Sequence, residues 1–407
     1  MAQRMAIVGA NAAGGSAAAT LRSEGFDGDL VLIGEEDSLP YERPPMSKGY
    51  LRGESGFENT LLKPDSFYEE NDIDVRLGVA VTSIDPQNRT LHLSDGETVD
   101  YDRVLIATGG HNFHPPIAGI DLDGVLGLRT VKDADRLRER MADARHAVVV
   151  GLGFIGSEVA ASLRQMGLDV TAIEAESGPL LGALGPDVSR VMEGVHRDNG
   201  VELVLGDAVA SFEGDGAVER IVTRSGHSVE CDFAVVGLGI RPNTDVVNGT
   251  GVELNNGIVV DEYSRTSVDG IYAAGDVANH YHPLAGEHMR VEHWQNAMMQ
   301  GAAAARSMLD RGEPYRSVHW FWSDQYDQSL QYAGFHGHWD EMVVRGSLQD
   351  RNFVVFYLQD GRLRAAAALN RARDLRGAQR IIEAGKHPDR EQLRDEDQDL
   401  RRMARED

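Results

Sequence analysis

Two glycine-rich turns, each set between a predicted strand and a predicted helix, place the strongest constraint on the fold of this chain. The first lies in residues 5–34 and the second in residues 147–174. The elements expected around them are strand Met5–Val8, helix Ala12–Arg22 and strand Asp29–Ile33 in the first unit, and strand Ala147–Val150, a helix ending near Gln165 and strand Asp169–Ile173 in the second. A glycine turn inside a βαβ unit is typical of a dinucleotide-binding domain. We therefore expect an α/β protein with two Rossmann-like domains.

The segments that follow each unit indicate how the chain divides. Residues 100–110 and 231–242 share a buried-strand pattern that ends in small residues, and residues 257–277 return to strand-rich sequence. The chain is therefore expected to return to its first domain after making the second. From about Val318 the composition changes to an aromatic segment, His319–Trp322, strands near Glu341–Val344 and Phe353–Tyr357, an arginine-rich helix and a charged end. This pattern predicts a C-terminal α+β domain. The predicted domains are a discontinuous first domain of residues 1–110 and 244–317, a second of residues 111–243, and a third of residues 318–407, whose last residues, Asp395–Asp407, are expected to be solvated and frayed.

Charge and cysteine content exclude several classes of function. The formal net charge of −25 opposes non-specific binding to nucleic acid. One cysteine, Cys231, excludes an intramolecular disulfide, a Cys-x-x-Cys pair and an iron–sulfur cluster held by this chain. No apolar run approaches the roughly 20 residues that cross a bilayer, and the spacing of the first glycines argues against a signal peptide. We expect a soluble protein of the cytoplasm that borrows its redox chemistry.

The second glycine turn carries an intact Gly-x-Gly-x-x-Gly as Gly151, Gly153 and Gly156. Such glycines permit a tight turn, close approach of a pyrophosphate to backbone N–H groups, and close packing of helix on strand. Glu174 follows at the end of the next strand, where a carboxylate accepts hydrogen bonds from a ribose diol. A carboxylate repels a 2′-phosphate, and residues 175–188 contain no arginine, so NAD(H) is favoured over NADP(H).

The first glycine turn departs from this pattern because Asn11 stands between Gly9 and Gly14. Asparagine tolerates a left-handed backbone but is bulkier than glycine, which puts the pyrophosphate geometry there in doubt. Glu35, again at a strand end, supplies the expected ribose ligand. Asp276 follows another strand and precedes a predicted helix, where its carboxylate accepts a hydrogen bond from a ribityl chain, caps the helix, or does both.

The segment Tyr41–Lys48 (YERPPMSK) points to an unusual lysine. Pro44 and Pro45 predict a helix start, which puts Lys48 in the first turn, where the helix dipole disfavours a cation and a compensating anion is needed. The alternative is an ordinary surface lysine. Glu158 lies in an otherwise apolar helix, close to the expected nicotinamide, with a solvent-facing position as its alternative.

Histidines and tryptophans are further candidates for a site. The pairs His280/His282 and His336/His338 suggest metal binding, but no third ligand follows at a supporting spacing. We therefore interpret them as surface-loop histidines and expect no metal site. Trp294 and Trp322 have packing in the core as their alternative interpretation.

A series of motifs spread over the chain resembles the FAD-dependent, NADH-using ferredoxin reductases of bacterial oxygenase systems, within the glutathione-reductase-like flavoproteins. The motifs are IVGANAAGGSAA, YERPPMSK, LIATGG, GLGFIGSEVA, GLGIRPN, IYAAGDV, VEHWQNA, FWSDQYDQSLQYAG and ALNRARDLR. The resemblance implies that the first domain binds FAD and the second NAD(H). The FAD contacts it implies are Gly9, Ala13, Gly14, Glu35, Arg43, Lys48, Val81, Thr108, Gly109, Arg129, Asp276 and Trp294, and the NAD(H) contacts are Gly151, Gly153, Ile155, Gly156, Glu158, Glu174 and Gly239.

The resemblance also implies a reaction and the residues that carry it. A lysine like Lys48 lies near the flavin, paired with a glutamate like Glu158, and a tryptophan like Trp322 flanks the site. The implied activity is hydride transfer from NADH to FAD, followed by single-electron transfer to a two-iron, two-sulfur ferredoxin. Related disulfide and peroxide reductases carry a cysteine in the region of residues 44–48, where this chain has none, so those activities are excluded.

Other electron acceptors stay open at this point. A rubredoxin reductase or quinone-type reductase would share the flavin motifs, and a signalling flavoprotein resembling apoptosis-inducing factors is the alternative from another class. An acidic ferredoxin would need a local basic patch on this acidic chain, for which Arg290, Arg306 and the arginines after residue 361 are candidates.

Overall fold

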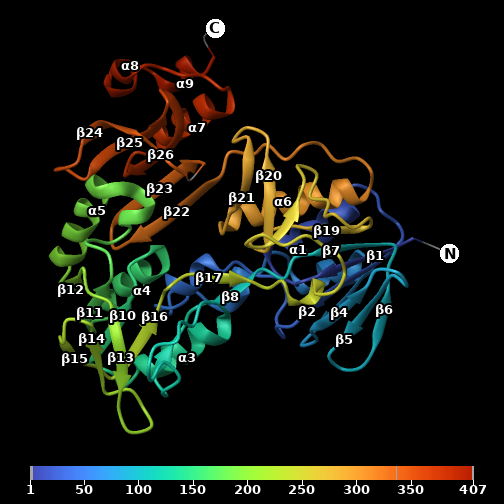
Figure 1. Ribbon diagram of the computed structural model, residues 1–407, viewed down its shortest axis with the longest axis horizontal. Helices are drawn as coiled ribbons and strands as arrows, with labels where there is room; N and C mark the ends of the chain where they lie inside the picture. Colours follow the sequence, from blue (N-terminus) through green and yellow to red (C-terminus); the bar gives the residue numbers. More distant parts are fainter. Residues whose placement is uncertain (1–2, 336, 406–407) are drawn as a thin grey trace. The chain divides into compact units, whose positions relative to one another are not determined.

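The computed structural model describes residues 3–335 and 337–405 and divides into two compact units (Figure 1). Unit 1 comprises Met1–Glu42, Phe57–His111 and Arg241–His319, and unit 2 comprises Arg43–Gly56, Asn112–Ile240 and Trp320–Asp407. The chain leaves unit 1 at β8 (Gly110–Asn112) and returns to it at β17 (Ile240–Pro242). Within the described residues, no helix is both long enough and apolar enough to cross a bilayer.

Unit 1 is built on a five-stranded parallel sheet with the strand order β19-β7-β1-β2-β3. Its elements are β1 (Arg4–Val8), α1 (Ala12–Ser23), β2 (Asp29–Gly34), η2 (Phe57–Thr60), α2 (Asp65–Glu70), β3 (Ile73–Leu77), β4 (Val81–Asp85), β5 (Thr90–Leu93), β6 (Thr98–Asp100), β7 (Arg103–Ile106), η3 (Asp245–Val247), β18 (Ile258–Val260), β19 (Ile271–Ala273), β20 (Ala278–His282), β21 (Glu287–Arg290) and α6 (Trp294–Met308). Two smaller three-stranded sheets, β4-β5-β6 and β18-β20-β21, complete the unit.

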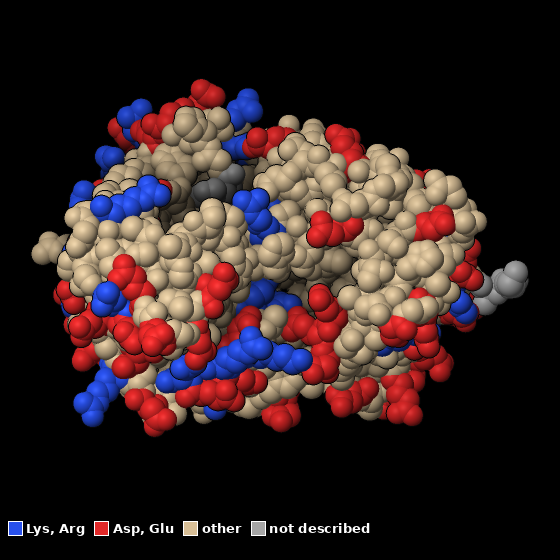
Figure 2. Space-filling model, turned by 60° about the horizontal axis from the view of Figure 1, so that its bottom comes forward, with Lys and Arg blue, Asp and Glu red and all other residues tan. Residues whose placement is uncertain are grey.

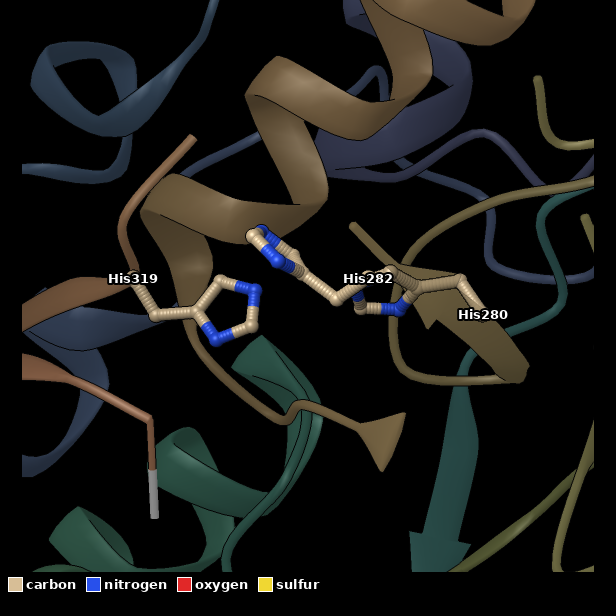
Figure 3. Close-up of side chains that lie close together, drawn as sticks. All are labelled: His280, His282 and His319. Carbon is tan, nitrogen blue, oxygen red and sulfur yellow. The ribbon is translucent and has the colours of Figure 1, made fainter. Parts of the chain in front are cut away.

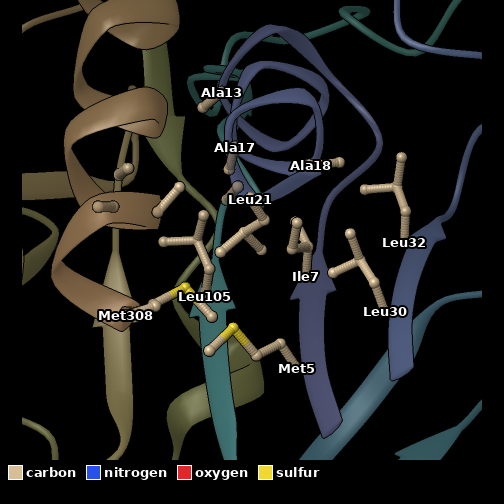
Figure 4. Packing of buried hydrophobic residues seen from close by; sticks show 14 of the residues in the cluster. Met5, Ile7, Ala13, Ala17, Ala18, Leu21, Leu30, Leu32, Leu105 and Met308 are labelled. Carbon is tan, nitrogen blue, oxygen red and sulfur yellow. The ribbon is translucent and has the colours of Figure 1, made fainter. Parts of the chain in front are cut away.

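The parallel strands of unit 1 are apolar almost throughout because both faces of the sheet are covered. On one face, helix α1 packs over side chains of β1, β2 and β7, as Figure 4 shows. The labelled residues of this cluster are Met5, Ile7, Ala13, Ala17, Ala18, Leu21, Leu30, Leu32, Leu105 and Met308. Helix α6 approaches the start of α1 so closely that a Cβ at Gly301 would lie 2.2 Å from the Ala13 carbonyl oxygen. Only glycine permits that approach, which fixes the N-terminus of α1 beside α6.

Unit 2 contains a second parallel core and an antiparallel C-terminal sheet. The parallel sheet has the order β12-β11-β10-β16-β9, and the C-terminal sheet has the order β22-β23-β26-β25-β24. The elements are η1 (Pro44–Ser47), β9 (Val125–Leu126), α3 (Val131–Met141), β10 (His146–Val150), α4 (Phe154–Gln165), β11 (Asp169–Glu174), α5 (Leu181–Asp198), β12 (Val201–Leu205), β13 (Val209–Glu213), β14 (Arg220–Thr223), β15 (Ser228–Glu230), β16 (Phe233–Val236), β22 (Trp320–Gln325), β23 (Gln328–Gly334), β24 (Glu341–Ser347), β25 (Asn352–Gln359), β26 (Arg362–Leu369), α7 (Ala372–Glu383), α8 (Arg390–Arg394) and α9 (Leu400–Met403).

The predicted fold class is confirmed, and both βαβ units lie within a residue or two of their expected bounds. The C-terminal sheet is larger than the sequence indicated, because β23 and β26 lie between the strands that were expected. One face of this sheet packs on α5, where Tyr357 donates a hydrogen bond to the Leu184 carbonyl at 2.7 Å. The alanine run of β26 hides its strand character in the sequence, since alanine favours helices.

The expectation of a frayed C-terminal end is wrong for the residues described there. The guanidinium of Arg345, which is 3% exposed, donates to the backbone carbonyls of Asp395 and Gln398 at 2.7 and 2.8 Å. Leu400 of α9 is buried, and a Cβ at Gly377 of α7 would lie 2.5 Å from the Cβ of Leu400. The charged tail is therefore docked by the buried Arg345, by the apolar contact of Leu400, and by an ion pair between Arg371 and Glu396 at 2.7 Å.

Candidate cofactor and electron-transfer site

The glycine turn of unit 2 has the geometry of an anion cradle. Gly151 has φ +89°, and a Cβ at Gly156 would lie 1.9 Å from the Gly151 carbonyl oxygen. These two glycines are required by the packing of the turn. Gly153, the N-cap of α4, differs: its φ is −69°, and an added Cβ would meet nothing within 4 Å. The protein itself does not require glycine at Gly153, so the open space beside it fits a pyrophosphate approaching the N–H groups of the helix.

Glu174 ends β11 and faces this turn. One carboxylate oxygen accepts the Leu152 N–H at 2.6 Å and the other accepts the Glu176 N–H at 2.9 Å. Each oxygen keeps a second lone pair, so the carboxylate is oriented and can still accept from a ribose hydroxyl. The large apolar side chain of Ile155 is 46% exposed at the start of α4. Gly239 has φ +88°, and an added Cβ there would also meet open space.

The turn of unit 1 is equally tight, but Asn11 plays a different part from the one expected. A Cβ at Gly9 would lie 2.1 Å from the Ala107 carbonyl oxygen, and one at Gly14 would lie 1.9 Å from the Gly9 carbonyl oxygen. Asn11 has φ −128°, so no left-handed tolerance is needed. Its side-chain oxygen caps α1 by accepting the N–H groups of Ala13 and Gly14 at 3.1 and 3.3 Å, and its amide donates to the Ala107 carbonyl.

Unit 1 gathers several of the other predicted FAD residues around this turn. Glu35 is exposed directly after β2, and the Gly34 that precedes it approaches Ala10, since a Cβ there would lie 2.5 Å from the Ala10 Cβ. A Cβ at Gly275 would lie 3.0 Å from the Ala13 Cβ, which brings the turn that carries Asp276 to the start of α1. The helix expected after Asp276 is instead strand β20, so the helix-capping interpretation is wrong.

The remaining predicted FAD residues of unit 1 occupy element ends. Thr108 and Gly109 follow β7 and are tied to Asn243: the Thr108 hydroxyl donates to the Asn243 carbonyl at 2.7 Å, and the Asn243 amide donates to the Thr108 carbonyl at 3.0 Å. Sequence reasoning missed Asn243, although it ends the quoted motif GLGIRPN. Val81 begins β4, and Trp294 is the first residue of α6; both are half-buried.

Lys48 and Glu158 form a buried ion pair in unit 2. The Lys48 Nζ lies 2.6 Å from Glu158 Oε2, with exposed side-chain fractions of 13% and 3%. The compensating anion is therefore present, but the reason given for it was wrong. The proline pair makes only a four-residue 3₁₀ turn, η1, and Lys48 is its C-cap, where its Nζ also donates to the Pro44 carbonyl at 3.3 Å. A solvent-facing Glu158 and an ordinary surface Lys48 are both excluded by this burial.

A second hydrogen-bonded residue holds the Glu158 carboxylate, and sequence reasoning missed it. Ser47 donates to Glu158 Oε2 at 2.5 Å, and Ser162, one turn further along α4, donates to the Ser47 carbonyl at 2.7 Å. Because both serines are buried, α4 and the segment after η1 are joined by polar contacts shielded from water. The signal that the sequence offered for Ser47 was its position next to Lys48.

Three further predicted site residues, Arg43, Arg129 and Trp322, also lie in unit 2. Arg43 donates from Nη1 to the Arg129 carbonyl at 2.5 Å, which ties η1 to the start of α3. Trp322 lies on β22, half-buried and stacked on Trp320 with ring centroids 5.2 Å apart. The neighbouring Phe321 packs edge-to-face on Phe154, the first residue of α4, at 4.6 Å. Helix α4 thus contacts both the segment of Lys48 and the strand of Trp322.

The histidines at 280 and 282 differ from expectation. Both are buried, at 1% and 0% exposure, on β20, so the surface-loop interpretation is wrong for them. Of the second pair, His338 is described and lies outside any helix or strand, whereas His336 lies outside the described residues. Burial was not visible in the sequence because Tyr315 and His319, which pack on both rings, come from a segment more than 30 residues further along the chain.

Two of the arginines considered for a docking patch form ion pairs within the chain. On the face that Figure 2 presents, acidic side chains gather mainly toward the lower part and the edges, with basic side chains among them. Arg290 pairs with Glu292 at 2.7 Å, and Arg306 pairs with Glu24 at 2.8 Å. Arg290 and Arg306 are therefore engaged within the chain, and the candidates after residue 361 stay a prediction.

The single cysteine is unsuited to redox chemistry. Cys231 is buried, and burial raises the pKa of its thiol to about 12. Because the thiolate is the nucleophilic form, this residue does not reduce a disulfide or a peroxide.

Comparison with known proteins agrees with the site. The family described as pyridine nucleotide-disulphide oxidoreductase matches residues 3–301. The chain belongs to this family. A second family, described as reductase C-terminal, matches residues 320–404. The motif-based resemblance to FAD-dependent ferredoxin reductases is confirmed, and with it the expectation of FAD and NAD(H) as the cofactors of this family.

Relatives cover almost the full chain. Rhodocoxin reductase of Rhodococcus erythropolis is 38% identical over 97% of this chain and 93% of that protein. The ferredoxin–NAD(+) reductase component of the anthranilate 1,2-dioxygenase system of Burkholderia cepacia is 40% identical over 96% of both chains. Among solved structures, the covalent putidaredoxin reductase–putidaredoxin complex matches with a TM-score of 0.95 at 32% identity, covering 98% of both chains.

Proposed function

We propose that this chain is an FAD-dependent NADH:ferredoxin oxidoreductase that supplies electrons to a bacterial oxygenase through a two-iron, two-sulfur ferredoxin. The proposal rests on two glycine cradles in one chain and on relatives named as ferredoxin–NAD(+) and putidaredoxin reductases. The proposal goes beyond the family assignment because it names one type of electron acceptor.

The observation that carries the proposal is the buried Lys48–Glu158 pair at the segment after Pro44 and Pro45. A reductase of disulfides needs a reactive thiol, and the one thiol of this chain is buried with a raised pKa. An ion pair at this segment suits a reductase whose electrons leave for another protein. The flavin site then needs positioning and charge, and no nucleophile from the chain.

Residues of unit 2 would hold NADH and the reacting end of the site. The N–H groups around Gly153 would bind the pyrophosphate, and Glu174 would accept from the adenosine ribose. Bound FAD would supply the acceptance of a hydride from NADH and the release of electrons one at a time. Lys48 is held by the Glu158 carboxylate and the Pro44 carbonyl, so its ammonium would place a fixed positive charge beside the flavin. Trp322 would exclude water from the nicotinamide side.

Residues of unit 1 would hold FAD. Ala13 and Gly14 at the start of α1 would lie at the pyrophosphate, Glu35 at the adenosine ribose, and Asp276 at the ribityl chain. The contact of Gly275 with Ala13 supports a common site for these groups. We also propose the three-domain division, with FAD bound by residues 1–110 and 244–317, NAD(H) by 111–243, and a C-terminal domain of 318–407. A cytoplasmic location completes the proposal.

The test measures NADH-driven reduction of cytochrome c by the FAD-loaded protein, with and without a panel of two-iron ferredoxins and a rubredoxin. The expected result is a large increase that depends on one or more ferredoxins. If NADH reduces the flavin but only rubredoxin or a quinone accelerates turnover, the acceptor assignment is wrong. If no carrier accelerates turnover, a slow redox-sensing flavoprotein replaces the proposal.

Matched lysine variants test the role of the ion pair. Lys48→Met should lower the rate constant of flavin reduction by NADH at least tenfold, whereas Lys63→Met, at an exposed lysine of unit 1, should leave it unchanged. Flavin absorbance after mixing with NADH in a stopped-flow instrument reports this step alone. Equal rates in the two variants would remove Lys48 from the mechanism while leaving the acceptor assignment intact.

A further inference from the structure

Three buried histidines of unit 1 form a cluster that the electron-transfer function does not use. His280 and His282 occupy alternate positions of β20, so their side chains leave the same face of the strand. His319, the last residue of unit 1, reaches them from 37 residues beyond His282. Their exposed fractions are 1%, 0% and 1%. Figure 3 shows the three side chains directed toward one another from two segments of chain.

The spacing of the rings fits a single metal ion. One ring nitrogen of each histidine lies within 4.8 Å of those of the other two. The ring centroids of the three pairs are 5.7, 5.5 and 5.1 Å apart, each pair in an edge-to-face arrangement. Ligand nitrogens about 2.0–2.1 Å from a tetrahedral Zn²⁺ are about 3.3 Å apart, so side-chain rotations that bring the three nitrogens closer by up to about 1.5 Å would complete the geometry.

Hydrogen bonding orients His282 as a ligand. Its Nε2 lies 3.0 Å from the Ser317 carbonyl oxygen. A carbonyl only accepts, so Nε2 carries the proton and Nδ1 carries the lone pair. Support of one ring nitrogen by a backbone carbonyl is the usual arrangement for a metal-bound histidine.

His280 supplies the second, independent observation. Across the described chain, neither of its ring nitrogens has a hydrogen-bond partner, although the side chain is buried. A buried polar group without a partner is costly. A metal ion bound to one of these nitrogens would satisfy it.

Two further side chains of unit 1 lie beside the cluster: the His293 ring centroid is 6.3 Å from that of His319, and Tyr315 contacts the other two histidines. Tyr315 packs edge-to-face on His280 and His282 at 5.6 and 6.0 Å, but its hydroxyl donates to Asn296 Oδ1 at 2.9 Å. Burial raises the pKa of Tyr315, which keeps that hydroxyl protonated. A water molecule in the fourth position is typical of a zinc ion with three histidine ligands.

We propose that His280, His282 and His319 bind one divalent transition-metal ion, Zn²⁺ or an ion of similar ligand preference. Three imidazoles suit zinc, copper or nickel and do not suit magnesium or calcium. The ion would cross-link β20 to the end of unit 1, immediately before Trp320 begins β22. Its role is structural: it fixes the last segment of unit 1 and takes no part in hydride transfer.

The experiment uses untagged, FAD-loaded full-length protein, stripped of metal with a chelator and then titrated with Zn²⁺, Co²⁺ or Mg²⁺. The expected result is one Zn²⁺ per chain by elemental analysis after gel filtration, a visible absorption band of tetrahedral Co²⁺, and an upward shift of the thermal unfolding midpoint with Zn²⁺ but not with Mg²⁺. H280Q and H319Q should each lose the Co²⁺ band and the shift. H92Q, at an exposed histidine of β5 in the same unit, should keep both.

The outcomes separate a metal site from a packed histidine cluster. Absence of stoichiometric Zn²⁺ and of the Co²⁺ band in the unmodified protein overturns the proposal without reference to any variant. Binding that persists in folded H280Q and H319Q, checked by circular dichroism, overturns it as well. Ferredoxin-dependent cytochrome c reduction, measured on the same samples, tests the electron-transfer function separately.

Discussion

Replacement of Gly153 by alanine should separate cofactor binding from folding. The backbone there has φ −69° and ψ −171°, which alanine adopts without strain, and the added methyl group would meet nothing within 4 Å. The loss of chain entropy in the unfolded state favours alanine by about 0.4–1 kcal/mol. The preference of an N-cap for glycine over alanine opposes it by a similar amount. The net change in unfolding free energy should therefore stay within about 1 kcal/mol.

The same methyl group enters the space where a pyrophosphate would approach the helix N-terminus. Loss of one hydrogen bond to a charged group costs about 1.5–3 kcal/mol, which corresponds to an increase of about 10- to 150-fold in the dissociation constant of NADH. The assay is the NADH dependence of flavin reduction in a stopped-flow instrument, with the unfolding midpoint measured on the same preparation. The unfolding midpoint should move by no more than about 4 °C.

Two other glycines serve as controls for this prediction. Gly337→Ala, at an exposed position with equally open surroundings, should change neither quantity. Gly156→Ala should lower stability outright, because its Cβ would lie 1.9 Å from the Gly151 carbonyl oxygen. If Gly153→Ala bound NADH as tightly as the unmodified protein, the open space would not be the pyrophosphate site, and the reasoning from the glycine turn would be refuted.

Three further predictions concern buried polar groups. Burial lowers the pKa of His196 from 6.5 to about 4. Between these values the folded state binds fewer protons than the unfolded state, so the free energy of unfolding is unaffected by this group above pH 6.5 and falls by about 3 kcal/mol as the pH drops to 4. Urea unfolding at pH 7 and pH 4.5 should show a smaller loss in His196→Gln than in the unmodified protein, and equal losses would contradict this. Arg345→Leu should release the C-terminal tail at a cost of about 3 kcal/mol, because the tail carbonyls lose their donor. Mass spectrometry should then detect trypsin cleavage beyond residue 393. In Arg362→Leu, at an exposed arginine, the tail should stay resistant to trypsin. Ser47→Ala should lower the flavin reduction rate through the orientation of Glu158, and rescue by Ser47→Thr would distinguish lost hydrogen bonding from misfolding.

Local sequence determined the two dinucleotide-binding cores. A buried parallel strand appears in the sequence as a short apolar run. Glycine is the one residue that fits where φ is positive or where backbone atoms lie about 2 Å from the position of a Cβ. Such glycines mark the two turns unambiguously: Gly9, Gly14, Gly151 and Gly156. The acidic residues at the ends of β2 and β11 follow from the same local spacing.

Tertiary structure alone decided which distant side chains meet. Lys48 and Glu158 are 110 positions apart. The sequence predicted an anion beside Lys48 from a helix start at the two prolines, and that reason was wrong because the turn there ends after four residues. His319 completes the histidine cluster only because unit 1 ends beside β20. Local periodicity indicates which residues are buried on one element. Contacts such as these depend on which elements pack together, and that choice includes the entropy of bringing distant segments together, which no local sequence pattern records.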